Sequence, residues 1–112
     1  GCTEPAGARS RFGALLLGGF RDGQLLYVGK VGTGFSEERL DSLWKSFRPL
    51  VRRAPAFADP PRARGLTWLE PTLVAQVSYT EWTADRKLRH PVFLGLRDDK
   101  SAAECVLPET AP

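Results

Sequence analysis

Alternating hydrophobic and polar positions predict several short strands. Residues 92–96 read Val-Phe-Leu-Gly-Leu, which is typical of a strand buried on at least one face. A dense charge cluster, Arg97, Asp98, Asp99 and Lys100, ends this strand abruptly. Further strands are predicted at residues 12–20, 24–31, 67–70 and 73–82. Arg21, Asp22 and Gly23 predict a turn between the first two.

The hydrophobic spacing changes to that of a helix after residue 35. Ser36 is suited to the N-cap because its hydroxyl can accept from first-turn amides, and Glu37 and Glu38 follow it. Apolar residues then recur at i, i+3, i+4 and i+7, which predicts one buried helical stripe of Leu40, Leu43, Trp44 and Phe47. Pro49 ends the helix.

Five strands joined by hairpins, with one helix, predict a small closed sheet, because closure removes exposed strand edges. The expected fold is all-β: a five-stranded Greek-key barrel of the OB-fold type, with one inserted amphipathic helix covering an open end. The ordered domain is expected at residues 11–107. Residues 1–10 are small and polar and are expected to be a flexible linker or non-native remnant, and residues 108–112 a loose tail.

Composition narrows the class of protein. A chain of 112 residues, 42% hydrophobic and 26% charged, fits one ordinary globular domain. It contains no apolar run of membrane-spanning length and no secretory signal. Cys2 and Cys105 lack metal-ligand spacing, so reduced thiols and a cytoplasmic location are preferred over a zinc site or a bridge between the termini.

Positive charge concentrates in the middle of the chain. The net charge is +3 overall, but residues 45–64 hold six cations and one anion, Asp59, which gives +5 locally. Such a basic segment indicates either a solvated loop or a surface that contacts a phosphate backbone.

The sequence contains no complete active site. Its one histidine, His90, precedes Pro91 and has no recognised nucleophile context. The glycine-rich residues 29–34 match neither a Walker loop nor a dinucleotide fingerprint, and no Lys-x-Asp-Gly nucleophile is present. The charge cluster at residues 97–100 is either a strand end with local ion pairs or a contributory site that holds polyphosphate oxygens.

Several blocks in register resemble a known family. They read Phe-Gly-Ala-Leu-Leu-Leu-Gly at 12–18, Tyr-Val-Gly-Lys-Val-Gly-Thr-Gly-Phe at 27–35, Trp-Leu-Glu-Pro at 68–71, Glu-Trp-Thr at 81–83 and Leu-Arg-His-Pro-Val-Phe-Leu-Gly-Leu-Arg-Asp-Asp-Lys at 88–100. Together they resemble the C-terminal OB domain of bacterial ATP-dependent DNA ligases, most closely the ligase module of the end-joining enzyme DNA ligase D. The resemblance covers residues 11–107.

The resemblance implies a part in nick sealing during DNA repair and non-homologous end joining in the bacterial nucleoid. Residues 97–100 match the ligase pattern Arg-x-Asp-Lys, so Arg97 and Lys100 would contact the β and γ phosphates of ATP during enzyme adenylylation, and Asp99 would set their geometry. ATP and Mg²⁺ would be bound mainly by a preceding nucleotidyltransferase domain that carries the lysine nucleophile. The isolated domain, a monomer with no metal site or cofactor of its own and no membrane contact, is expected to be inactive.

DNA contacts are expected to follow the basic residues. The family domain embraces duplex DNA across the minor groove, and the residues assigned to phosphate contacts here are Lys30, Arg52, Arg53, Arg62 and Arg64. One departure from the family is visible. The family hairpin usually reads Thr-x-Asp-Gly-x-Leu-Arg, whereas this sequence has Arg86 in place of the glycine. The change requires a different turn or a positive φ at Arg86.

Two other functions stay open. A free-standing OB module that binds single-stranded nucleic acid would expose aromatic residues for base stacking, and exposure of Trp82 with Phe57 would favour it. A protein-interaction barrel without any nucleic-acid role is the third interpretation.

Overall fold

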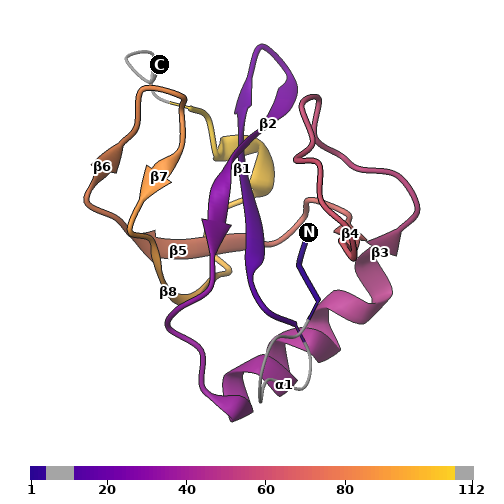
Figure 1. Ribbon diagram of the computed structural model, residues 1–112. Helices are drawn as coiled ribbons and strands as arrows, with labels where there is room; N and C mark the ends of the chain where they lie inside the picture. Colours follow the sequence, from indigo (N-terminus) through magenta and orange to yellow (C-terminus); the bar gives the residue numbers. More distant parts are fainter. Residues whose placement is uncertain (5–11, 108–112) are drawn as a thin grey trace.

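The computed structural model describes residues 1–4 and 12–107, which form several strands and one α-helix (Figure 1). This set of secondary-structure elements is consistent with the OB-fold. The strands pair as four separate two-stranded sheets, and the described residues form no closed sheet. The mostly-strand fold with one helix is therefore confirmed, whereas the closed five-stranded Greek-key barrel is not.

The predicted first hairpin is present. Strands β1 (Leu15–Arg21) and β2 (Gln24–Val31) pair antiparallel. Asp22 and Gly23 between them have φ of 53° and 79°, the two positive values that a tight hairpin turn requires. A bulge between Leu17 and Gly18 bends the pair.

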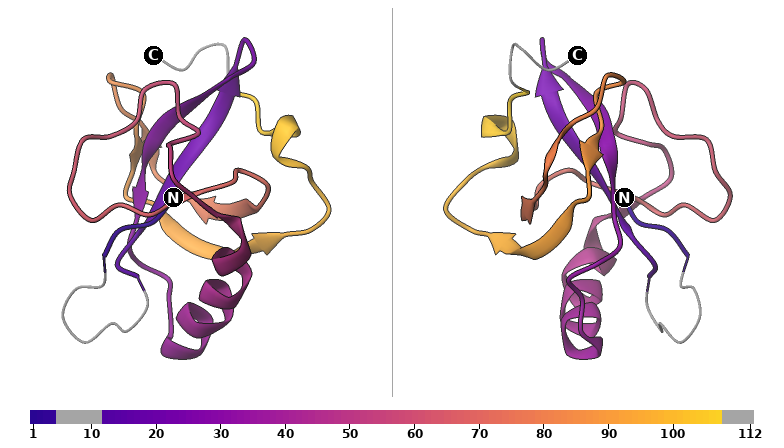
Figure 2. Two further views of the ribbon diagram at one scale, coloured as in Figure 1. Left: turned by 90° about the vertical axis from the view of Figure 1, so that its right-hand side faces the viewer. Right: turned by 60° about the vertical axis from the view of Figure 1, so that its left-hand side comes forward.

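The helix also forms as predicted. Helix α1 (Glu37–Phe47) begins at Ser36, whose Oγ accepts from the Arg39 amide at 3.1 Å. Its apolar stripe buries Leu40, Leu43 and Phe47, and Trp44 packs against the same core. A short 3₁₀-helix, η1 (Arg48–Leu50), follows. Both views of Figure 2 show α1 at one end of the molecule, below the strands.

The first residues of the chain are packed, unlike the linker expected for residues 1–10. Cys2 is 1% exposed and bridges Leu15 of β1 and Thr67, exchanging 2.9 Å backbone hydrogen bonds with Thr67 in both directions. Thr67 directly precedes β4 (Trp68–Leu69), which pairs with β3 (Val51–Arg52). The segment pairs because these edges need backbone partners and cysteine is a small apolar side chain. The rest of the expected linker and the tail at 108–112 lie outside the described residues.

The second half of the chain contributes two further pairs. Strand β5 (Val74–Ser78) pairs antiparallel with β8 (Val92–Arg97), and β6 (Glu81–Trp82) pairs with β7 (Leu88–Arg89). The single strand predicted over residues 73–82 is therefore divided at Tyr79 and Thr80. A turn of 3₁₀-helix, η2 (Ala102–Glu104), follows β8, and no side-chain hydrogen bond from Ser101 caps it.

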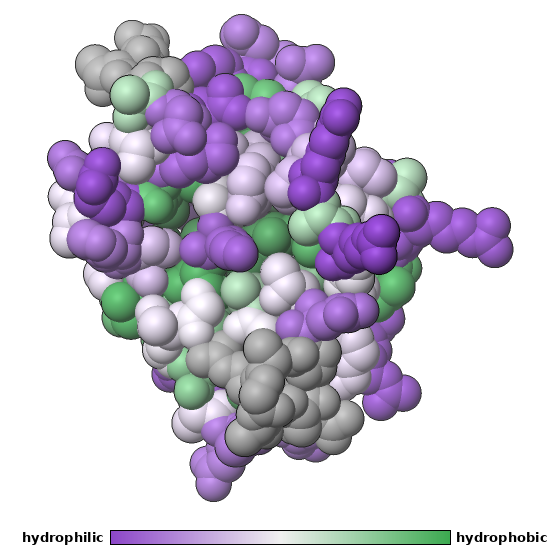
Figure 3. Space-filling model, viewed as in Figure 1, coloured by the Kyte–Doolittle hydropathy of each residue, from purple (hydrophilic) through white to green (hydrophobic). Residues whose placement is uncertain are grey.

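One core joins the helix to the strands. Phe12, Phe35 and Phe93 stack or meet edge to face, with ring centroids 4.9 and 5.4 Å apart. Phe93 is the buried side of β8, whereas Val92, Leu94 and Leu96 are exposed. Figure 3 shows apolar patches between polar side chains on the face viewed in Figure 1. Cys2 and Cys105 are both free thiols. No helix in the described ranges is long and apolar enough to cross a membrane.

Candidate functional site

The charge cluster at residues 97–100 lies where the chain leaves β8. Arg97, the last residue of the strand, pairs with Val74 of β5, and the next three residues bend away. The Arg97 side chain meets Asp99: its Nε donates to Oδ1 at 3.1 Å and its Nη2 donates to Oδ2 at 2.9 Å. This two-point contact fixes the guanidinium plane. Nη1 forms no hydrogen bond or ion pair with the described residues, so that edge of the guanidinium can donate to an anion.

The pair is charged and accessible to solvent. The hydrogen bond from Arg97 holds the pKa of Asp99 below its usual value, and the same bond raises the pKa of Arg97. The side chain of Asp99 is 65% exposed and that of Arg97 is 38% exposed. Because solvent screens exposed ion pairs, the contact contributes little to stability and acts mainly on the direction of the guanidinium.

Lys100 lies beside an apolar cavity of about 420 Å³. The walls are mostly aliphatic and aromatic residues of β1, β4 and β5 with the segment after η2, and Lys100 has the one cationic side chain among the described lining residues. A lysine in such a place packs its hydrocarbon stem on apolar surface and keeps its ammonium in water. The structure thus brings Arg97 and Asp99 into contact, with Lys100 three residues beyond Arg97. Asp98 is exposed and unpaired within the described part of the chain.

The expected DNA contacts divide into two groups. Arg52 in β3 is already engaged: its Nη1 lies 3.2 Å from Oε1 of Glu70. The other four are exposed, with Lys30 on β2 and the remaining three, Arg53, Arg62 and Arg64, in the loop between β3 and β4. Long hydrophilic side chains project on the side of Figure 3 where this loop runs in Figure 1.

The aromatic residues do not form the platform that a stacking module needs. Phe57 is 8% exposed and buried. Trp82 is half-buried, and its ring meets that of Tyr79 edge to face with centroids 5.8 Å apart. Tyr79 has the one exposed ring among the described Phe, Tyr and Trp residues. A single exposed ring does not favour the single-strand alternative.

The described residues do not gather the oxygen ligands that a Mg²⁺ site needs. Within residues 1–4 and 12–107, no group of three or more His, Cys, Asp or Glu side chains could hold a metal ion. Both carboxylate oxygens of Asp99 accept hydrogen bonds from Arg97.

His90 is exposed, with φ of +52° at the junction between β7 and β8.

The sequence did not predict one polar cluster. Arg86 has φ of +64°, so of the two possibilities that the sequence left open for this turn, the positive φ is the one present. Its guanidinium reaches Asp59 in the loop between β3 and β4. Arginine at the turn indicated an unusual backbone conformation at position 86. The partner of Arg86, Asp59, lies 27 residues away, so no local sequence pattern predicts their contact.

Residues 8–100 match the family model described as the ATP dependent DNA ligase C terminal region. The chain is 40% identical over 110 residues to the multifunctional non-homologous end joining protein LigD of Pseudomonas aeruginosa, covering 93% of this chain. It is 42% identical over 103 residues to the LigD of Mycobacterium tuberculosis, covering 89% of this chain. It spans only 13% and 14% of the length of these two relatives.

Solved structures agree with these matches. The crystal structure of the ligase domain of M. tuberculosis LigD superposes with a TM-score of 0.78 at 40% identity, over 86% of this chain and 33% of that domain. A mycobacterial DNA ligase D complexed with ATP and MES gives a TM-score of 0.80 at 40% identity, over 87% of this chain and 33% of that protein.

Proposed function

Because the chain belongs to the C-terminal domains of ATP-dependent DNA ligases of the LigD type, we propose that its charge cluster orients the pyrophosphate of ATP during enzyme adenylylation. In this reaction a lysine of a nucleotidyltransferase domain attacks the α phosphorus, a bond to AMP forms and pyrophosphate leaves. The departing group must lie opposite the attacking nitrogen, so cations that hold it lower the barrier by orientation and electrostatics.

The observation that carries the proposal is the two-point contact between Arg97 and Asp99. It holds the guanidinium with Nη1 open at a strand end, where a neighbouring domain can present a phosphate. Lys100 adds a second positive charge three residues on, in the Arg-x-Asp-Lys spacing. Mg²⁺ would neutralise phosphate charge when bound with ATP, and its ligands would come from the nucleotidyltransferase domain.

The second part of the proposal concerns DNA. Exposed cations on β2 and in the loop between β3 and β4, with no described partner, would contact the phosphates of a nicked or broken duplex: Lys30, Arg53, Arg62 and Arg64. Arg52 would have to exchange its contact with Glu70 for one with DNA. Such contacts carry no sequence preference, and the affinity would fall steeply as salt rises. We further propose that the sheets form a five-stranded barrel of the OB type. The protein would act as a monomer in the bacterial cytoplasm.

The test separates two chemical steps. This chain is joined to a LigD nucleotidyltransferase domain, and the product, here termed the ligase module, is assayed for self-adenylylation and for sealing of pre-adenylated nicks. Arg97→Ala is expected to slow adenylylation on the order of a hundredfold, because one donor to the leaving group is lost. Sealing of the pre-adenylated nick needs no pyrophosphate contact and is expected to change much less.

Arg89→Ala is the matched control, because Arg89 is also an exposed arginine paired with a carboxylate, Oε1 of Glu81 at 2.8 Å from its Nε. It is expected to leave both steps unchanged. Equal loss of adenylylation and sealing in Arg97→Ala would contradict the proposed role.

A further inference from the structure

Arg86 occupies a strained position in the hairpin between β6 and β7. Its amide donates to the carbonyl of Thr83 at 3.1 Å, and the amide of Thr83 donates to the carbonyl of Lys87 at 2.7 Å. This turn places Arg86 at φ +64°, a value that glycine adopts freely and arginine does not. A residue held there against its backbone preference indicates that its side chain makes a compensating interaction.

The side chain of Arg86 is directed inward rather than toward solvent. It is 20% exposed, and its Nη2 donates to Oδ2 of Asp59 and, at 3.4 Å, to the carbonyl of Tyr27. Its Nε is buried without a hydrogen-bond partner in the described chain. Burying that donor is a second cost, which the charge-assisted contact with Asp59 must offset.

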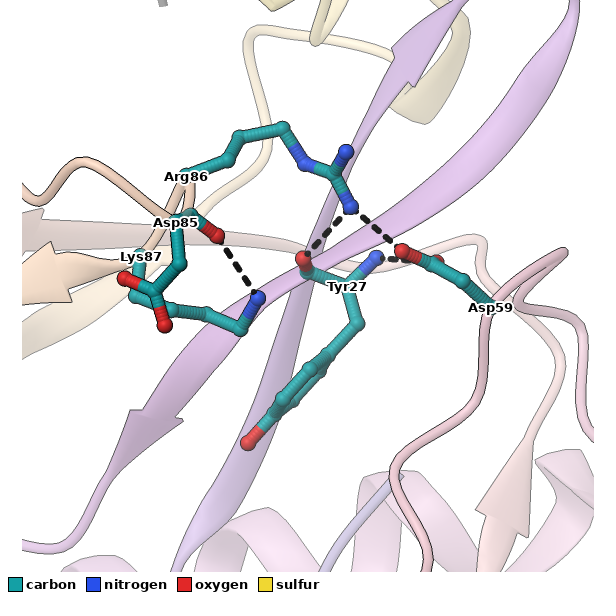
Figure 4. Close-up of polar contacts among 5 residues, drawn as sticks. All are labelled: Tyr27, Asp59, Asp85, Arg86 and Lys87. Atoms are coloured by element: carbon teal, nitrogen blue, oxygen red, sulfur yellow. Dashed lines mark hydrogen bonds and ion pairs between the residues drawn. The ribbon is translucent and has the colours of Figure 1, made fainter. Parts of the chain in front are cut away.

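Asp59 hydrogen-bonds to the backbone of Tyr27, as Arg86 does. Its Oδ1 accepts the Tyr27 amide at 2.9 Å, so Asp59 and Arg86 together satisfy both backbone polar groups of one residue on the outer edge of β2 (Figure 4). The Tyr27 ring lies edge to face with Phe57 and under the ammonium of Lys87. Tyr27 thus joins the loop between β3 and β4 to the hairpin between β6 and β7.

The same loop carries the exposed cations. Asp59 is the one acidic residue among residues 45–64, and Arg62 and Arg64 follow it by three and five positions. A lone acid in a basic segment reduces attraction to a polyanion unless it has another task. Its contacts with β2 and Arg86 provide that task.

We propose that Asp59 and Arg86 form a clamp that holds this loop against β2, so that Arg62 and Arg64 meet the phosphates of duplex DNA in a fixed orientation. Asp59 and Arg86 are positioning residues and do not contact DNA. The inference rests on the proposed DNA role of the loop.

Electrostatics and the clamp predict opposite effects for one substitution. Asp59→Asn removes a negative charge from the basic face, and simple attraction predicts tighter binding to DNA. If the clamp acts as proposed, the same change weakens binding, because the loop loses its orientation although the net charge rises. A direct contact between Arg86 and DNA also predicts tighter binding in Asp59→Asn, because Arg86 is then released.

The clamp is tested first in the 112-residue chain. Asp59→Asn is expected to increase both the exchange rate of the Tyr27 amide and the rate of trypsin cleavage after Arg62 and Arg64, by about tenfold. The control is Glu81→Gln, which makes the same charge change and breaks the exposed ion pair with Arg89 in the strands of the hairpin that carries Arg86. It is expected to leave both rates unchanged.

The affinity of the ligase module for nicked duplex then tests the positioning. Asp59→Asn is expected to weaken it severalfold relative to Glu81→Gln. Unchanged exchange and cleavage rates in Asp59→Asn, or an affinity for nicked duplex equal to or higher than that of Glu81→Gln, would overturn the inference. If Arg62→Ala with Arg64→Ala leaves DNA affinity unchanged, the DNA role of the loop fails and the positioning inference fails with it, whereas the exchange rates still report whether the clamp itself exists.

Discussion

At the scale of residues, one carboxylate sets how an arginine can be used. Arginine presents donors on two edges of a planar group, and Asp99 takes the edge formed by Nε and Nη2. The other edge is then fixed in direction before any ligand arrives, which reduces the ordering cost of binding a phosphate. A lysine at position 97 could not replace this arrangement, because an ammonium group has no plane to orient.

The contact between Arg97 and Asp99 predicts a specific pH response. The hydrogen bond lowers the pKa of Asp99 from its ordinary 3.8, so the contribution of the pair is present above that value and is lost as pH falls through the lowered pKa. The contact is therefore expected to persist through pH 4 and to open only in stronger acid. A titration of the Asp99 carboxyl carbon by NMR measures this pKa directly.

Arg97→Gln removes the cation and keeps a side chain of similar length. In this variant the pKa of Asp99 is expected to rise toward its ordinary value. An unchanged pKa would contradict the two-point contact as its cause.

At the scale of elements, glycine allows a loop to lie directly on a strand. Gly34, with φ of +97°, lies against the backbone of Phe93, and a Cβ there would overlap the Phe93 carbonyl oxygen. The Phe93 amide donates to the carbonyl of Thr33 at 2.9 Å, so the loop before α1 is hydrogen-bonded to β8. This contact fixes β8, and hence Arg97 at its end, relative to the helix.

Two glycine substitutions separate backbone strain from close packing. Gly23→Ala is expected to cost roughly 1 kcal/mol, because φ is +79° but no atom lies within 4 Å of the added carbon. Gly34→Ala combines the same strain with a backbone overlap and is expected to cost on the order of 3 kcal/mol or more. Urea unfolding of both variants measures the difference, and equal losses would contradict the close contact with Phe93.

Elements defined by local signals were predictable from the sequence. Ser36, the spacing of Leu40 with Phe47, and the turn at Asp22 and Gly23 each act within a few residues, and the helix and hairpin form where they indicated. The strand at residues 73–82 was predicted too long, because alternation does not reveal a break at Thr80, whose amide donates to Arg89 in β7. Cys2 looked like part of a linker because pairing with Thr67 leaves no local pattern.

At the scale of the whole molecule, side chains connect strands that are not paired by backbone hydrogen bonds. The edge of β2 is covered by one bridge, between Leu25 and Phe57, and by the contacts of Asp59 and Arg86 with Tyr27. Contacts of this kind depend on positions distant in sequence, so they could not be predicted. The charge cluster could be located from its spacing, but the orientation of Arg97 by Asp99 required the structure.

Adenylylation of the ligase module in Asp99→Asn and Asp98→Asn tests the central claim most directly. The two acids are adjacent and both exposed, and only Asp99 has a described partner, Arg97. If Asp99 orients Arg97 toward the leaving pyrophosphate, Asp99→Asn slows adenylylation by about tenfold or more and Asp98→Asn leaves it unchanged. Equal rates in the two variants would contradict the claim that this contact directs the chemistry.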